Sequence, residues 1–200
     1  MTRVGDSFDK TSHNKVKRLP KKGKYDKESV YRVLDEGLVC HVGFCTDDGP
    51  IVIPMAYGRD GDVIYLHGST ASRMTKANKT ESPVCCTVTL LDGLVIARSL
   101  FNHSMAYRSV VVFGTANEVS EEEERNHALQ VITDHIIPGR WEDARAPSPA
   151  ELKATRVLKV SIESASLKES GLAPDDDKKD ITDNAFWAGS IPIHTVFGEA

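Results

Sequence analysis

The sequence contains no run of about twenty apolar residues, the length that a membrane-spanning helix requires. It also has no apolar stretch near its start, so we expect no secretory signal and no membrane partner. Only four of its 200 residues are cysteines, and none forms a Cys-x-x-Cys pair. Without an export signal, we expect a cytoplasmic protein whose thiols stay reduced.

Several catalytic motifs are absent as well. There is no Gly-x-Ser-x-Gly nucleophile motif, no Gly-x-Gly-x-x-Gly dinucleotide motif and no Walker A phosphate loop. These absences argue against a serine hydrolase, a Rossmann nucleotide site and a P-loop enzyme. Cys40, His41 and Cys45 are poorly spaced for zinc, so we expect no metal site.

The net charge of −4 gives no reason to expect nucleic acid as a partner. Seven of the basic residues are nevertheless concentrated between Lys10 and Lys24. One interpretation of this cluster is an arm that binds nucleic acid. The interpretation that we favour is a solvated, flexible tail over residues 1–24.

Local signals predict four helices. Asp26 and Gly37 have the positions of an N-cap and a stop for a helix over residues 27–36. A short helix begins near Ser72 and ends at about Asn78. Ser120 and Glu123 have capping-box spacing and predict a helix through Ile136. Ser148, Pro149 and Glu151 suit the first positions of another short helix.

Apolar and β-branched runs predict the strands, which we place at residues 38–45, 51–57, 63–67, 84–90, 94–97, 107–118 and 157–162. Asp48-Gly49 and Asp92-Gly93 are typical of tight turns between antiparallel strands. Many strands with few helices favour a mainly β (α+β) fold, a small antiparallel barrel with covering helices. We assign residues 25–165 to this domain and residues 166–200 to a C-terminal extension.

Residues 67–73 carry the strongest local sign of ligand chemistry. A strand ends at His67-Gly68-Ser69 and a helix begins at Ser72-Arg73. Backbone amides at a helix start, serine hydroxyls and an arginine together favour a phosphate. Ordinary helix capping by serine explains the same residues equally well, so the sequence alone leaves both interpretations open.

Two further segments contain candidate functional residues. Residues 98–109 are polar and aromatic but lie between apolar strands, and their His103 is either a proton donor or a histidine satisfied by local backbone groups. Trp187 follows an acidic linker, in a Trp-Ala-Gly motif. We expect this tryptophan to anchor the extension in a groove or to stack near a planar ligand.

These motifs resemble the pyridoxamine-5′-phosphate-oxidase-like superfamily of FMN-binding proteins, specifically its flavin-nucleotide-binding branch that includes nitroimidazole-resistance proteins. The segments that carry the resemblance are residues 52–57, 64–69, 72–74, 89–99, 103–114 and 187–192. The resemblance implies a six-stranded split β-barrel and a homodimer with FMN at the subunit interface. Ala106 and Asn102 depart from the branch pattern, beside the expected pocket, which puts substrate preference in doubt.

The resemblance also implies roles for individual residues. Phosphate binding would fall to Ser69, Ser72 and Arg73, with Lys76 assisting. The other cofactor contacts expected from the family pattern are Pro54, Met55, His67, Gly68, Met74, Tyr107, Arg108, Ser109 and Trp187. His67 and His103 are the candidates for moving a proton.

The function expected from this resemblance is electron or hydride transfer through bound FMN to a small organic acceptor. The alternative is a non-enzymatic protein of the same fold that binds a flavin, a deazaflavin or heme. The sequence identifies neither the substrate nor the electron donor. True pyridoxamine phosphate oxidation is not expected, because the C-terminal substrate-binding signature of those oxidases is not recognised.

Overall fold

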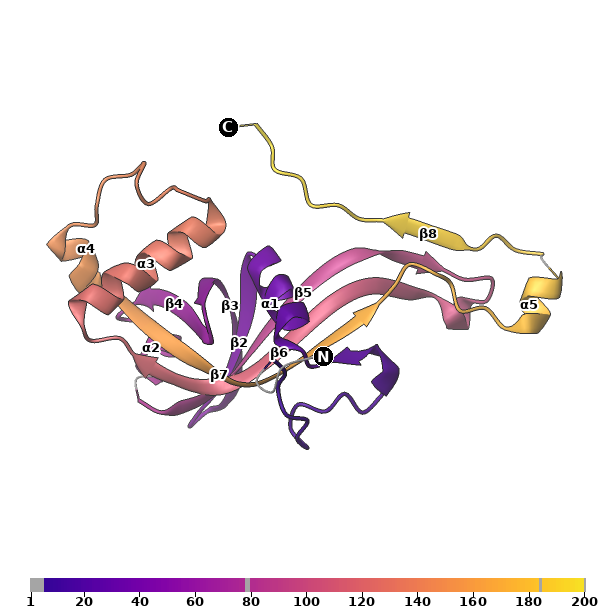
Figure 1. The fold of residues 1–200 in the computed structure, drawn as a ribbon, viewed down its shortest axis with the longest axis horizontal. Coiled ribbons are helices and arrows are strands. Elements are labelled where there is room, and N and C mark those ends of the chain that lie inside the picture. The colour runs from indigo at the N-terminus through magenta and orange to yellow at the C-terminus, as the bar shows by residue number, and fades with distance from the viewer. Residues whose placement is uncertain (1–5, 78–79, 184, 200) are drawn as a thin grey trace.

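A computed structural model describes residues 6–77, 80–183 and 185–199. The elements in chain order are the 3-10 helix η1 (Pro20–Lys22), β1 (Gly23–Lys24), α1 (Lys27–Glu36), β2 (Val39–Thr46), β3 (Gly49–Asp60), β4 (Val63–Ser69), α2 (Arg73–Ala77), β5 (Ser82–Ile96), the 3-10 helix η2 (Leu100–Asn102), β6 (Ser104–Glu118), α3 (Glu122–Ile136), α4 (Pro149–Ala154), β7 (Thr155–Ser170), α5 (Lys178–Asp183) and β8 (Gly189–Pro192). Figure 1 shows a small barrel with α3 and α4 at one end and a long arm at the other.

Six strands close the barrel. Their order is β7, β4, β3, β2, β5 and β6, and β6 pairs again with β7. All of these pairings are antiparallel. The ring confirms the six-stranded antiparallel barrel that the sequence predicts.

Alternate residues of each strand fill the barrel interior, as the two-residue period of a strand requires. Val42, Leu66 and Val110 are fully buried there, together with Leu34 from α1. Burial of each such side chain contributes about 1.5–3 kcal/mol to folding. The hydroxyl of Tyr57 donates to the carbonyl of Leu34 and fixes α1 to β3.

Helix α1 begins and ends where the sequence predicts. Asp26 accepts a hydrogen bond from the amide of Ser29 at 2.8 Å, and Gly37 is the C-cap. Ser148 and Glu151 form the expected capping box of α4. The predicted capping box of α3 at Ser120 is wrong, because the N-cap is Glu121.

The pairing of β6 with β7 explains the later start of α3. The amide of Val119 donates to the carbonyl of Val157 at 3.0 Å, so the chain remains extended up to that point. Helix α2 is described as far as Ala77, and its expected end at Asn78 lies outside the described residues.

Asp92-Gly93 does not reverse the chain, so the two strands predicted on either side of it are one strand, β5. The register between β5 and β6 shifts there, since Leu91 pairs with Tyr107 and Gly93 pairs with Ala106. Asp92 is therefore the extra residue of a β-bulge. Beyond the bulge, β5 and β6 continue into the arm, where β8 pairs with β5.

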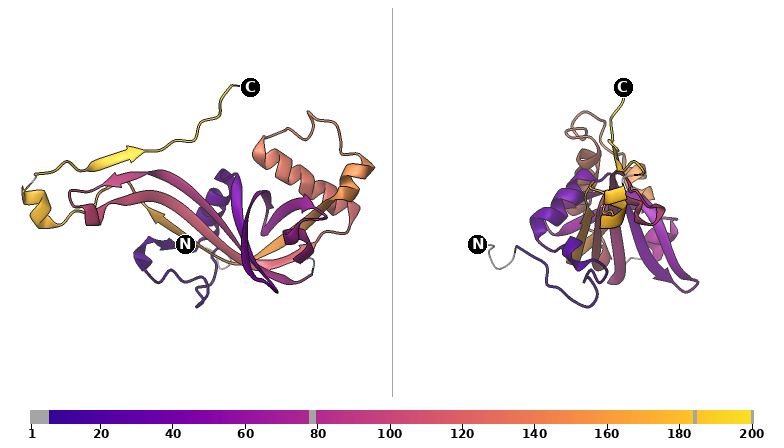
Figure 2. Two further views of the ribbon diagram at one scale, coloured as in Figure 1. Left: turned by 180° about the vertical axis from the view of Figure 1, so that it is seen from behind. Right: turned by 90° about the vertical axis from the view of Figure 1, so that its right-hand side faces the viewer.

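The N-terminal segment, expected above to be a tail, packs on the barrel over residues 6–24. Phe8 is buried and β1 pairs with β7. Figure 2 shows this segment beside β7, at the base of the arm. The C-terminal boundary of the barrel domain was predicted at residue 165, but β7 continues past that residue and ends at Ser170. None of the helices in the described part of the chain is long and apolar enough to cross a lipid bilayer.

Helix α3 covers the outer face of β3 and β4, where Ala128 and Ile132 pack with Tyr65. It lies so close to β3 that a Cβ atom on Gly58 would be 2.6 Å from the carbonyl oxygen of Val131. Only glycine permits this separation without a shift of the helix.

Gly58→Ala should therefore destabilise the protein by about 1–3 kcal/mol, since the added methyl group overpacks the contact between β3 and α3. Thermal denaturation of both proteins measures the loss. Gly171→Ala is the matched control, because a Cβ atom there meets nothing within 4 Å. Equal melting temperatures for wild type and Gly58→Ala would contradict the close contact.

Candidate functional site

The corner between β4 and α2 is tied together by its serines. The amide of Ser72 donates to the carbonyl of Ser69 at 2.9 Å. The Ser69 hydroxyl oxygen accepts from the amide of Ala71 at 3.2 Å, and that of Ser72 accepts from Thr75 at 3.3 Å. The Ser72 hydroxyl therefore caps α2 and the Ser69 hydroxyl stabilises the turn before it, and each keeps its own hydrogen for a further acceptor.

Positive charge is available at this corner. Arg73 and Lys76 are exposed on α2. Within residues 6–77, 80–183 and 185–199, the side chain of Arg73 has no hydrogen-bond or ion-pair partner. A free guanidinium beside two hydroxyls suits a phosphate, which accepts strong charge-assisted hydrogen bonds.

His67 is the unusual residue next to this corner. Its Nδ1 atom is buried and lacks a hydrogen-bond partner among the described residues. Burial also lowers the pKa of His67 below its ordinary value of 6.5. The ring is therefore neutral at neutral pH, with one buried nitrogen that a bound molecule would satisfy.

The neighbouring predicted residues differ in their surroundings. A Cβ atom on Gly68 would lie 3.1 Å from the Thr75 methyl group and 3.9 Å from the Met55 methyl carbon, so a larger residue there would crowd the buried Thr75. Pro54, on β3, is exposed. Met74 is 1% exposed and packs in the hydrophobic core, and its contact with a cofactor stays a prediction.

The three site residues predicted on β6, Tyr107, Arg108 and Ser109, point to two different sides of the strand. Tyr107 and Ser109 line a groove on the outer face of the barrel. Arg108 points to the other side, where its guanidinium contacts Asp92 at 2.8 Å and also pairs with Glu36. These two carboxylates raise the pKa of Arg108. Arg108 thus belongs to an ion-pair network that joins α1, the bulge and β6, and its contact with a cofactor stays a prediction.

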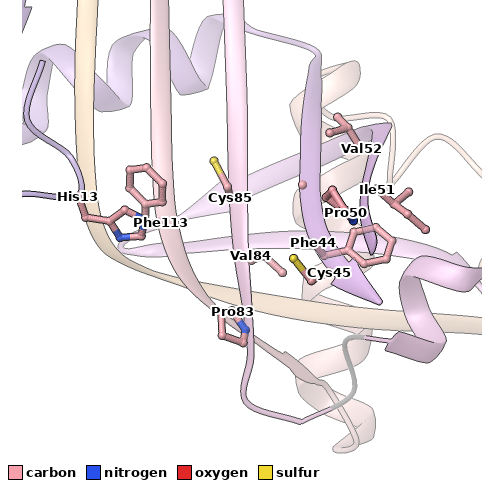
Figure 3. A pocket seen from close by; sticks show the side chains of 11 residues that line it. His13, Phe44, Cys45, Pro50, Ile51, Val52, Pro83, Val84, Cys85 and Phe113 are labelled. Carbon is pink, nitrogen blue, oxygen red and sulfur yellow. The ribbon is translucent and has the colours of Figure 1, made fainter. Parts of the chain in front are cut away.

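The outer face of β2, β5 and β6 carries no charged side chain. The residues that alternate with the buried ones are His41, Gly43, Cys45, Pro83, Cys85, Thr87, Thr89, Tyr107, Ser109, Val111 and Phe113. An apolar groove of about 310 Å³ lies beside this face, where Val52 is 64% exposed. Figure 3 shows the groove, with the His13 ring stacked on Phe113 at 3.9 Å between centroids.

Two other predicted site residues, His103 and Trp187, lie together on the arm. A pocket of about 490 Å³ is lined by His103 and by apolar residues that include Leu100, Phe186 and Trp187. Nδ1 of His103 is 2.9 Å from the carbonyl oxygen of Ser99. Leu100 and Phe186 were not predicted as site residues. An apolar residue within a polar turn is the sequence signal that could have identified them.

The predicted site residues therefore lie in separate parts of one chain. Figure 1 shows α2 at the barrel end and α5 and β8 at the far end of the arm. Ser69 and Arg73 belong to the first region, and His103 and Trp187 belong to the second. Among the residues that the structure describes, no cluster of three or more His, Cys, Asp or Glu side chains has the arrangement of a metal site.

A family model described as pyridoxamine 5′-phosphate oxidase matches residues 26–169, from the N-cap of α1 to the end of β7. The chain belongs to this family. Among curated proteins, none matches this chain. The pyridoxamine 5′-phosphate oxidase family match includes all six strands of the barrel and leaves out the N-terminal segment and the C-terminal extension.

Solved structures extend the match. The flavocytochrome Anf3 from Azotobacter vinelandii is 39% identical, with a TM-score of 0.89, and the match covers 95% of this chain and 88% of that chain. The FAD and heme binding protein from Mycobacterium smegmatis is 37% identical, with a TM-score of 0.84 and coverage of 90% and 87%. A structure named for 5-nitroimidazole antibiotic resistance, from Bacteroides thetaiotaomicron, is 27% identical, with a TM-score of 0.59 and coverage of 72% and 83%.

The network of Arg108 predicts a dependence of stability on pH. Its hydrogen bond to Glu36 lowers the pKa of that carboxyl below the ordinary value of 4.5. The stabilisation is therefore fully present above about pH 4.5 and is lost as the pH falls through the lower, folded-state pKa. Glu36→Gln should reduce stability at neutral pH by up to about 1 kcal/mol, because the pair is partly exposed.

Chemical denaturation at neutral pH and at about pH 3 measures this effect. The difference between wild type and Glu36→Gln should shrink at the lower pH. Glu163→Gln is the control, since Glu163 is exposed and has no hydrogen-bond or ion-pair partner in the described part of the chain. A difference that is constant across this pH range would show that the Glu36 carboxylate does not act through its charge.

Proposed function

We propose that this chain is a flavin-dependent oxidoreductase that acts as a homodimer and passes electrons from bound flavin to a small organic molecule. The observation that carries this proposal is the similarity, over nearly the whole chain, to a flavocytochrome and to an FAD and heme binding protein. The family match alone ends at residue 169, whereas these similarities cover 95% and 90% of the chain.

The corner at β4 and α2 is the proposed site for the flavin 5′-phosphate, a group that FMN and FAD share. The hydroxyls of Ser69 and Ser72 would donate to its oxygens, and Arg73 would pair with its charge. Lys76, one turn further along α2, would add a second positive charge. Bound flavin would supply reversible uptake of electrons, while these residues hold and orient it.

A homodimer would bring the separated site residues together. The uncharged outer face of β2, β5 and β6 has the composition of a buried interface, from which charged residues are depleted. In a symmetric dimer, each copy of this face meets its own equivalent. Tyr107 and Ser109 lie on that face, so a second copy would place them opposite the flavin of the first.

The first test is the visible spectrum of the purified protein, followed by mass spectrometry of the released cofactor and of the native assembly. We expect flavin absorbance and a native mass of two chains with two flavins. The mass of the released cofactor separates FMN, FAD and deazaflavin. A colourless protein that takes up none of these would overturn the proposal, and a monomer would overturn the dimer.

Arg73→Gln should weaken flavin binding about 10- to 100-fold, because one charge-assisted hydrogen bond contributes about 1.5–3 kcal/mol. Fluorescence titration of cofactor-free protein measures the affinity. Arg140→Gln is the control, since Arg140 is exposed and its side chain bonds only the carbonyl of Asp143 among the described residues. Turnover with quinone or nitroaromatic acceptors separates an enzyme from a flavin carrier, which would bind flavin without turnover.

A heme site is a second candidate function, and the position of the His103 ring favours it. If the Nδ1–H of His103 donates to the carbonyl of Ser99, the Nε2 lone pair remains free to bind iron. The apolar wall of Leu100 and Trp187 suits a porphyrin face. Both side chains are largely exposed, at 88% and 66%, so a bound group would remove considerable apolar surface from water.

His67 is the competing iron ligand, because its buried Nδ1 has no partner in the described ranges. Heme titration monitored at the Soret band should show a 1:1 complex whose spectrum changes in His103→Ala. His67→Ala tests the competing ligand, and His127→Ala is the control, since His127 pairs with Asp60 on the surface. A Soret band unchanged in His103→Ala would exclude this ligand.

A further inference from the structure

The N-terminal segment forms one wall of a groove because it is fastened to the barrel. The amide of Phe8 donates to the carbonyl of Tyr25 at 2.9 Å, and the amide of Val16 donates to the Tyr25 hydroxyl at 2.9 Å. Between them, the side-chain amide of Asn14 donates to the carbonyl of Ala165 at 3.2 Å. The first two bonds fold the segment back onto Tyr25, and the third fastens it to β7, so its basic side chains occupy a defined place.

The groove between this segment and the outer side of β6 and β7 has a volume of about 470 Å³. Its lining includes four cations, Lys15, Lys17 and Arg18 from the segment and Lys168 from β7, and no Asp or Glu. None of these four side chains has a hydrogen-bond or ion-pair partner within the described ranges. In a chain with a net charge of −4, such a concentration of unpaired positive charge is unusual.

Four like charges around one groove repel each other, and an anion bound among them would relieve that repulsion. The hydroxyls of Ser109 and Ser166 are further donors in the lining, and Tyr107 adds an aromatic ring. Phosphate oxygens accept hydrogen bonds from such groups, and a purine base stacks on an aromatic ring. The volume lies within the usual range for small-molecule sites, roughly 300–1,000 Å³.

We propose that this groove binds the pyrophosphate-bearing end of an adenine nucleotide, with ADP as the smallest complete ligand. Within one chain it is separate from the corner at Arg73, whose residues do not line it, whereas in the proposed dimer its Tyr107 and Ser109 would face the corner of the other copy. Such a nucleotide has two chemical sources in a flavoprotein, the ADP half of FAD or an adenine-dinucleotide electron donor. The choice between these sources rests on the proposed function, whereas binding of ADP itself does not.

The test compares binding of ADP, AMP and adenosine by isothermal titration calorimetry. Affinity should fall in that order, because charge provides most of the attraction. Lys17→Gln/Arg18→Gln should weaken ADP binding by about 30-fold or more, since it removes two charged contacts. Lys178→Gln/Lys179→Gln is the matched control, with a similar loss of charge on α5, outside the groove lining.

The two nucleotide sources give different results with the same variants. If the groove holds part of FAD, Lys17→Gln/Arg18→Gln should copurify with less FAD than the control while binding added FMN as wild type does. If it holds the electron donor, the variant should keep its flavin and show a raised KM for NADH or NADPH.

The inference would be overturned if both double variants matched wild type in ADP affinity, FAD content and KM. Tighter binding of a single-stranded oligonucleotide than of ADP would also overturn it in favour of a nucleic-acid site. A protein that binds ADP in this way but never takes up flavin would retain the groove and lose the proposed function. A cofactor-free protein that takes up added flavin but has no affinity for ADP would do the reverse.

Discussion

The pairing of β6 with β7 is the interaction on which the rest of the structure depends. It runs from Tyr107 to Glu118 on β6 and closes the ring of six strands. A closed ring leaves no free strand edge within the barrel, which removes a site for unwanted pairing. The same pairing delays the start of α3, supports the arm and, through β7, gives the N-terminal segment its attachment at Ala165.

This architecture separates the candidate site residues within one chain. The barrel end carries Arg73, its uncharged outer face carries Tyr107, and the arm carries His103 and Trp187. Arg73 follows β4, His103 directly precedes β6, and Trp187 precedes β8, which pairs with β5. The dimer proposed above would bring residues of one copy next to different residues of the other.

Local chemistry made much of the fold predictable from sequence. The caps at Asp26 and Ser148 depend on residues within three positions of each other, so spacing alone identifies them. Asp92-Gly93 misled the prediction because a good turn sequence also suits a bulge, and pairing with a distant strand decided between them. The same dependence on distant partners kept the ion pairs of Arg108 and the attachment of the basic segment out of reach of the sequence.

Within the candidate site, the prediction was clearest where the residues are adjacent in sequence. Ser69 to Arg73 form one corner, and the resemblance to a flavin-binding family pointed to them directly. Met74 was included because residues 72–74 share the family resemblance, but a helix directs neighbouring side chains to different faces, and this one faces the core. The sequence could not reveal that the unpaired cations line one groove, because this depends on where residues 15–18 lie in three dimensions.

The bulge at Asp92 has a consequence for protein engineering. Side chains of a strand alternate between two faces, so one additional residue exchanges the faces of everything beyond it. The direction in which the apolar surface of the arm faces therefore depends on one residue, Asp92, at the base of the arm. A chimera that transplants the arm from a relative has to carry the bulge with it, since a graft joined one residue further along would turn the apolar surface of the arm in the opposite direction.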